Sequence, residues 1–289
     1  MFAQAGRTAT AATRRVGARR VGLEPRVDGV AEPRLTEGER WTRGELEALL
    51  ARRFSPRAIV RFLRHSSVRS AEIRRERPAL AHRAQGWIAL GAAAYLPLVG
   101  RRRAALAWWA LVALMLDWHL GMVETEHGEP RNLSAADALT LGRAWLVPLA
   151  LDAPTPLVCA TAAATDVLDG RIARRVGTTR AGRDLEGLVD TSFAAAALRG
   201  ARRRHWLGRR VVAAELARLG AGFAYALLVY FGRARAPADD LLHAARATTA
   251  LRMAGLAVAG AGRRRDADAL MLTGSAASVA LLVRSARAR

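Results

Sequence analysis

Two pairs of acidic residues near the middle of the chain have spacings that bring side chains together on helices. Asp166 and Asp169 lie three residues apart, and Glu186 and Asp190 lie four apart. Side chains at either spacing share one face of an α-helix. If the two helices pack side by side, four carboxylates converge on one pocket.

Four converging carboxylates repel one another strongly unless cations neutralise them. Carboxylate oxygens are hard ligands, which favour Mg²⁺, Mn²⁺ or Ca²⁺ over zinc. Two such ions about 3.5–4 Å apart suit an in-line displacement at phosphorus. A solvated position at a helix end is the simpler interpretation of any single acid. Because acids near a membrane are costly, the joint pattern beside long apolar runs favours a site.

Small residues and one arginine complete this segment. Gly170, Ala173 and Gly182 would allow close approach of a second helix or of a nucleotide. Arg174 could bind a phosphate through its planar guanidinium group. The segment therefore combines candidate metal ligands with candidate phosphate contacts.

This segment resembles the signature of the CDP-alcohol phosphatidyltransferase family, D-x-x-D-G-x-x-A-R, usually eight residues, then G-x-x-x-D-x-x-x-D. The first half matches at its five fixed positions, Asp166, Asp169, Gly170, Ala173 and Arg174. The second half departs twice, because seven residues separate Arg174 from Gly182 and Glu186 stands where the third Asp is expected. Asp184 is a poor substitute, since its spacing of six from Asp190 places it on another face.

The resemblance implies a metal-dependent transferase. Its substrates would be a CDP-linked lipid, usually CDP-diacylglycerol, and a small alcohol, which receives the phosphatidyl group as CMP leaves. The family's ions, Mg²⁺ or Mn²⁺ as a pair, would be held by Asp166, Asp169, Glu186 and Asp190. Asp190 would also be the catalytic base for the acceptor hydroxyl. The CDP moiety would contact Gly170, Ala173, Arg174 and Gly182.

The elements that must position these residues are apolar helices, which predicts an all-α, polytopic membrane bundle. Six apolar segments, at roughly 135–151, 156–166, 185–198, 211–231, 244–261 and 267–283, match the six-helix core of the family within 130–286. The segments near 160 and 190 are shorter than the roughly 20 residues that span a bilayer upright. We therefore expect these two helices to project past the membrane with the acids.

A weaker resemblance to the family lies upstream, from Asn132 through Thr140 to Arg143. Arg143 would either face a headgroup phosphate or extend to the membrane interface. Two charged pairs lie within apolar segments. Asp117 and His119 would form an interfacial cluster or a proton-active pair, and Glu215 and Arg218 would neutralise each other.

The chain before residue 130 divides into three parts. An Arg-rich tail at 1–40 lacks periodicity and is predicted to be disordered. In 41–84, apolar residues recur at helical spacing between arginines, which predicts basic amphipathic helices on an anionic membrane surface or a solvated helical hairpin. Apolar runs at 87–99 and 104–123 predict an additional transmembrane hairpin within 85–124.

The net charge of +21 comes from arginine, because the sequence has no lysine. Such a charge indicates an anionic partner. The arginines bracket apolar runs, so we expect the lipid bilayer as partner and no nucleic acid. We expect an integral protein of a bacterial plasma membrane with a cytoplasmic site, and the resemblance is consistent with a homodimer. The single cysteine, Cys159, is expected in the core.

Three alternatives stay open at this point. A catalytically impaired member of the family would act as a membrane lipid-nucleotide binding protein, which the exchange at Glu186 favours. A carrier with buried acids would transport a solute without binding nucleotide. A nucleic-acid-binding protein would rest on charge alone. The acceptor alcohol also stays open among glycerol phosphate, inositol phosphate, serine and other polyols.

Overall fold

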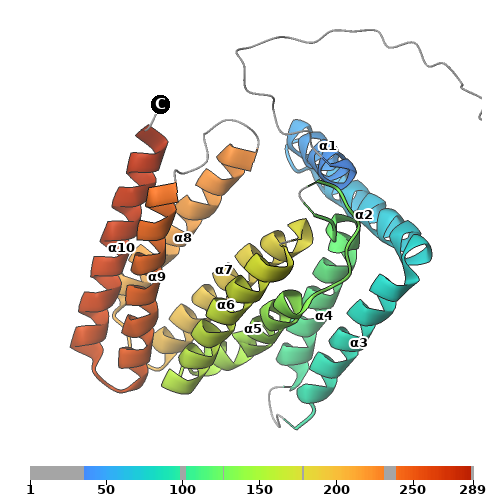
Figure 1. The fold of residues 1–289 in the computed structure, drawn as a ribbon. Coiled ribbons are helices and arrows are strands. Elements are labelled where there is room, and N and C mark those ends of the chain that lie inside the picture. Colours follow the sequence, from blue (N-terminus) through green and yellow to red (C-terminus); the bar gives the residue numbers. More distant parts are fainter. Residues whose placement is uncertain (1–35, 98–101, 126, 178, 231–238, 288–289) are drawn as a thin grey trace, which may run out of the picture. The chain divides into compact units, whose positions relative to one another are not determined.

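The computed structural model describes residues 36–97, 102–125, 127–177, 179–230 and 239–287 (Figure 1). In these ranges the chain forms ten α-helices and one 3-10 helix, and no β-strand. An isolated antiparallel bridge pairs Glu124 with Pro130 in the connection after the fourth helix. The prediction of an all-α fold is confirmed for the described part of the chain.

Prolines and capping side chains set several helix starts. Pro56, Pro78 and Pro156 each occupy the first position of a helix, where the missing N–H costs nothing. Thr36 and Ser134 each form a capping box with the residue three positions on. The helices are α1 (Glu37–Ala51), α2 (Pro56–Glu76), α3 (Pro78–Ala94), α4 (Arg102–His119), η1 (Leu120–Met122), α5 (Ala135–Asp152), α6 (Pro156–Val176), α7 (Arg180–Arg203), α8 (Arg209–Tyr230), α9 (Asp239–Gly260) and α10 (Arg264–Arg287).

Helix α5 packs against both α6 and α7, while α9 and α8 pack against α10 (Figure 1). Two clusters of buried apolar side chains hold these groups together. One joins α2, α3, α4, α5 and α7, and the other joins α5 through α10. Cys159 is buried in the second cluster, as expected. Helices α5 and α7 contribute to both clusters, so they form the framework on which a site between α5, α6 and α7 depends.

A close approach between α5 and α7 depends on one glycine. A Cβ atom added at Gly200 of α7 would lie 2.2 Å from the carbonyl oxygen of Ala150 at the end of α5. No side chain fits at that distance, so only glycine permits this crossing.

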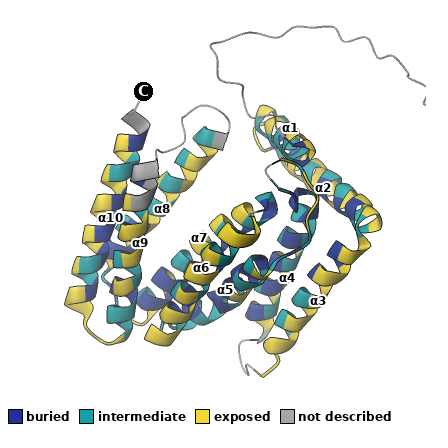
Figure 2. Ribbon diagram, in the orientation of Figure 1, coloured by how far each residue is buried: buried dark blue, intermediate teal, exposed yellow. Residues whose placement is uncertain are grey.

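Three helical segments are long and apolar enough to cross a bilayer, which supports a membrane protein. They are Arg103–Met122, Arg209–Val229 and Arg264–Ser285. Large apolar side chains such as Leu216 and Phe223 of α8 are exposed, and exposed residues follow the outer faces of α8 and α10 (Figure 2). Such surfaces are costly in water and stable in lipid.

The N-terminal predictions need correction at two boundaries. The tail predicted to be disordered over 1–40 lies mostly outside the described residues, but Thr36 caps α1 and residues 37–40 are its first turn. The boundary drawn at residue 84 falls inside α3, which runs without interruption from Pro78 to Ala94. The extra transmembrane hairpin is not confirmed, because only its second half, in α4, is among the candidate membrane spans.

The basic amphipathic region is attached to α4. Asp117 of α4 accepts hydrogen bonds from Ser70 and Arg74 of α2, whereas Nδ1 of His119 lies 2.7 Å from the carbonyl oxygen of Met115. Asp117 therefore anchors α2, and His119 bonds within its own helix. Both surroundings expected for residues 41–84, an anionic membrane surface or a solvated helical hairpin, stay predictions, and either must allow for this contact of α2 with α4.

A buried ionic cluster links α8, α9 and α10. Glu215 is 2% exposed, and its Oε2 lies 3.0 Å from Nε of Arg218, as the spacing predicted. Arg252 of α9 lies 3.7 Å from the same oxygen, and Ser275 of α10 donates a hydrogen bond to Oε1. The two arginines and one serine satisfy the carboxylate within the bundle.

Candidate active site

The acidic residues singled out in the sequence come from two neighbouring helices. Asp166 and Asp169 lie on α6, and Glu186 and Asp190 lie on α7. One carboxylate oxygen from each of Asp166, Asp169 and Glu186 lies within 4.8 Å of the other two. The two helices do not pack side by side as expected; both pack against α5, and this arrangement brings three of the four acids into one group, which we call the acidic cluster.

The fourth acid is held at the side of this cluster by an arginine. Oδ1 of Asp190 lies 3.1 Å from Nη1 of Arg143, a residue of α5. The side chain of Asp190 is 45% exposed, whereas that of Asp169 is 4% exposed. Asp190 is therefore accessible from outside the bundle, while Asp169 forms the buried end of the site.

Arg143 is the centre of an ion-pair network that the sequence did not reveal. Its side chain is 3% exposed and also pairs with Asp166 and Asp169. The expected extension of Arg143 to the interface does not describe this buried side chain, and its contact with a headgroup phosphate stays a prediction. Apolar neighbours on α5 suggested a membrane-facing side chain, and only the packing of α6 and α7 reveals its partners. One guanidinium group is shared by three carboxylates, so the acidic groups of the site outnumber the arginine that pairs with them and leave an excess of negative charge.

The donor set fits a divalent cation. Oδ2 of Asp169 accepts hydrogen bonds from Thr140, at 3.2 Å, and from Arg143. Oδ1 of Asp169 is buried and has no hydrogen-bond partner among the described residues. A buried acceptor without a partner costs about 1–3 kcal/mol. A hard cation bound by the acidic cluster would satisfy this oxygen and reduce the excess negative charge.

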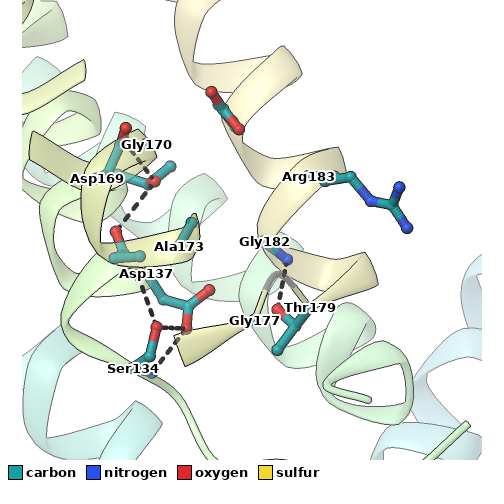
Figure 3. A pocket seen from close by; sticks show the side chains of 12 residues that line it. Ser134, Asp137, Asp169, Gly170, Ala173, Gly177, Thr179, Gly182 and Arg183 are labelled. Carbon is teal, nitrogen blue, oxygen red and sulfur yellow. Dashed lines mark hydrogen bonds between the residues drawn. The ribbon is translucent and has the colours of Figure 1, made fainter. Parts of the chain in front are cut away.

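A small pocket with a cavity volume of about 40 Å³, partly open to solvent, lies beside the acidic cluster between α5, α6 and α7 (Figure 3). Asp169 and Glu186 line it, and so do the predicted small residues Gly170, Ala173 and Gly182. Arg174 is exposed and is not among the lining residues described. The pocket instead has an arginine from α7, Arg183.

Gly182 is required by the shape of the pocket. A Cβ atom there would lie 2.8 Å from Oδ1 of Asp137 and 2.9 Å from Oγ1 of Thr179. Thr179 caps α7 by accepting a hydrogen bond from the backbone N–H of Gly182 at 3.0 Å. At Gly170, by contrast, the nearest atom is the flexible end of Arg174, at 3.3 Å. Of the two glycines, Gly182 is the one whose replacement would change the pocket directly.

Several polar lining residues escaped the sequence analysis. Asp137 is 6% exposed, and its Oδ2 accepts hydrogen bonds from the backbone N–H of Ser134, at 2.6 Å, and from the hydroxyl of Ser134, at 2.8 Å. The capping-box spacing of these two residues was visible in the sequence and would have marked the start of α5. That Asp137 also lines a pocket follows only from the position of α7.

The N-terminal helices touch the site at the start of α7. Glu39 of α1 forms an ion pair with Arg180, the first residue of α7. The backbone N–H of Arg180 donates to the carbonyl oxygen of Glu124 at 3.2 Å, and the Glu124 carboxylate accepts a hydrogen bond from Thr36. The region before residue 130, which lies outside the family resemblance, therefore braces the helix that carries Gly182, Glu186 and Asp190.

Comparison with protein-family models, with curated proteins and with solved structures finds no match for this chain. The fold and the site by themselves define an all-helical protein with three candidate membrane spans and a partly buried acidic cluster beside a polar pocket. Any more specific activity rests on the chemistry of these residues and on the sequence signature.

Proposed function

We propose that this protein is a membrane phosphotransferase of the CDP-alcohol phosphatidyltransferase type. It would transfer a phosphatidyl or related phosphoalcohol group from a CDP-linked lipid to a small alcohol and release CMP. The observation that carries the proposal is the acidic cluster, with its unpartnered Asp169 oxygen, beside a pocket lined by Gly170, Ala173 and Gly182.

The surrounding fold is consistent with this proposal. Six helices, α5 through α10, follow residue 130, the number that the family core has. Asp166 lies at the middle of α6, and Asp169, Glu186 and Asp190 lie in the halves of α6 and α7 that meet at the connection between the two helices. A site on this side of the bundle can meet a lipid headgroup while the apolar helices contact the acyl chains.

The exchange of Asp for Glu at position 186 does not remove the residue from the cluster. An oxygen of Glu186 lies within 4.8 Å of oxygens of both Asp166 and Asp169. The longer side chain therefore still reaches the other two acids. This favours a functional site over the alternative of an impaired lipid-nucleotide binding protein.

In the proposed reaction, the acceptor hydroxyl oxygen bonds to the β-phosphorus of the CDP-lipid. The bond from that phosphorus to the bridging oxygen breaks, and the bridging oxygen leaves with CMP. Asp190, half exposed at the side of the cluster, accepts the hydroxyl proton. Arg143 holds Asp166, Asp169 and Asp190 in position through its ion pairs. The small residues of the pocket, Gly170, Ala173 and Gly182, would contact the cytidine moiety.

Asp166, Asp169 and Glu186, with Asp190 beside them, would hold Mg²⁺ or Mn²⁺. When bound, such ions neutralise charge that develops on the phosphate oxygens. The chain's own part is to supply the carboxylates in fixed positions, which is the positioning and charge stabilisation that phosphoryl chemistry needs.

The test is product formation by the detergent-purified protein. It would be incubated with CDP-diacylglycerol, Mg²⁺ or Mn²⁺, and each of a panel of alcohols that includes glycerol 3-phosphate, inositol phosphate and serine. Mass spectrometry should find one new phosphodiester lipid, formed in equal amount to CMP. Binding of CDP-diacylglycerol without any product under every condition would instead support a lipid-nucleotide binding protein.

A further inference from the structure

One oxygen of a buried carboxylate faces the pocket. Asp137 is 6% exposed and lines the pocket opposite Gly182 and Thr179 (Figure 3). Its Oδ2 accepts both hydrogen bonds from Ser134. Its Oδ1 has no hydrogen-bond partner in the part of the chain that the structure describes, and it is the atom nearest to the absent Cβ of Gly182, at 2.8 Å.

The position of this oxygen relative to the acidic cluster limits what it can bind. Asp137 precedes Thr140 by three residues on α5, and Thr140 donates a hydrogen bond to Asp169 at 3.2 Å. Three residues of α-helix rise about 4.5 Å, and this distance separates the two levels of the pocket. A ligand whose phosphates lie at the acidic cluster would extend a neighbouring part of the molecule toward Asp137.

The charge of Asp137 determines the chemistry of that part. A carboxylate only accepts hydrogen bonds, and it repels phosphate oxygens unless a cation lies between them. It is not a member of the acidic cluster formed by the described residues. The favoured partner is a neutral hydrogen-bond donor, such as an amino group on a base or a hydroxyl group on a sugar.

We propose that Oδ1 of Asp137 accepts a hydrogen bond from a neutral donor of the nucleotide, and that Asp137 thereby determines which nucleotide the pocket accepts. This inference rests on the proposed function, which supplies a nucleotide as the ligand. Gly182 keeps Oδ1 of Asp137 open to the ligand, because the Cβ atom of any larger residue would lie against this oxygen. A pocket that presents an acceptor discriminates against ligands that lack the matching donor, since such ligands displace water from the acceptor without replacing its hydrogen bond.

Asp137→Asn nearly preserves the size of the side chain but places a hydrogen-bond donor where the wild type presents an acceptor to the ligand. The backbone N–H of Ser134 needs an acceptor, so the amide oxygen of the new side chain stays at the former position of Oδ2. The amide NH₂ group then faces the pocket and opposes the ligand's donor. The helix cap of α5 is retained, while the pocket gains a donor in place of an acceptor.

The experiment measures binding of CDP, UDP and 2′-deoxy-CDP to the full-length protein in detergent with Mg²⁺, by equilibrium dialysis. UDP lacks the amino group of the base, and 2′-deoxy-CDP lacks one sugar hydroxyl. Wild type should bind CDP about 10- to 100-fold more tightly than whichever analogue lacks the recognised donor. In Asp137→Asn this difference should fall to about threefold or less.

Thr155→Ala provides the matched control, because Thr155 caps the start of α6 through its side chain and is not among the residues that line the pocket. It should lower thermal stability without changing the ratio of affinities. If Asp137→Asn does not fold, Gly182→Ala covers the same oxygen with a methyl group and should abolish the same discrimination.

Equal binding of all three nucleotides by wild type, or unchanged ratios in both variants, would overturn the inference and leave the proposed function intact. A wild-type protein that binds none of the three nucleotides would instead contradict the proposed function, and the inference with it.

Discussion

Arg143 of α5 and Asp169 of α6 form an ion pair in which the two side chains are only 3% and 4% exposed. The same guanidinium group pairs with Asp166 and Asp190, so three carboxylates from two helices depend on one cation from a third. The pair therefore couples the packing of α5, α6 and α7 to the geometry of the site.

Replacing Arg143 should destabilise the protein mainly when no metal is present. Arg143→Met leaves three carboxylates without their shared cation, and loss of one partner of a buried ion pair costs about 3–5 kcal/mol. Thermal unfolding in detergent, followed by circular dichroism, should show this loss in EDTA. Mg²⁺ should restore part of it, because bound ions neutralise the same carboxylates.

Arg263→Ala is the control for Arg143→Met, since the Arg263 pair with Asp266 is exposed and should contribute at most about 1 kcal/mol. Equal stability of Arg143→Met and wild type in EDTA would show that the acids do not depend on Arg143.

Glu186 should act as a metal ligand despite its departure from the family signature. Glu186→Gln removes the charge at nearly constant size and should weaken Mg²⁺ binding about tenfold or more, as measured by the Mg²⁺ concentration that gives half-maximal CMP release. Glu186→Asp restores the family residue and should retain activity. A Glu186→Gln variant with unchanged Mg²⁺ dependence would exclude this residue from the metal site.

The ion pair between Glu39 and Arg180 should stabilise the start of α7. In Glu39→Gln, loss of the α1 carboxylate should loosen the first turn of α7, and hydrogen–deuterium exchange of the amides at 181–184 should become several-fold faster. Glu47→Gln, which breaks an exposed pair with Arg43 in α1, should leave that exchange unchanged. Equal exchange in wild type and Glu39→Gln would mean that α7 holds its start without this contact.

Two glycines of α7 should respond in opposite ways to alanine. Gly200→Ala would place Cβ 2.2 Å from the Ala150 carbonyl oxygen and should destabilise the protein by about 1–3 kcal/mol. At Gly187 no atom lies within 4 Å of the added Cβ, so Gly187→Ala should be neutral or stabilising by up to about 1 kcal/mol. Thermal unfolding of both variants checks the close crossing of α5 and α7, and equal stability of the two would contradict it.

The helices, and the residues that share a helix face, could be predicted from the sequence. Apolar segments separated by polar connections predicted α5 through α10, and spacings of three and four predicted that the acids share faces of α6 and α7. The Glu215–Arg218 pair was predictable for the same reason, because both residues lie on one helix. These features depend on residues close in the chain.

Features that depend on contacts between residues far apart in the chain could not be predicted from the sequence. Arg143 was expected to face a headgroup phosphate or to extend to the membrane interface, since its apolar neighbours on α5 do not reveal that α6 and α7 bring acids to it. The boundary predicted near residue 84 falls inside α3, because a change in composition does not interrupt the hydrogen bonds of the helix. Asp137 was missed as a pocket residue because only the closeness of Gly182 reveals it.

The rate of CMP release from CDP-diacylglycerol tests the central claim most directly. It would be measured in detergent with the acceptor alcohol, with and without Mg²⁺, for wild type, Asp169→Asn and Asp190→Asn. Wild type should release CMP only with the metal, and both variants should lose at least about a hundredfold in rate. Metal-independent release, or release at the wild-type rate by either variant, would contradict the assignment of the reaction to these acids.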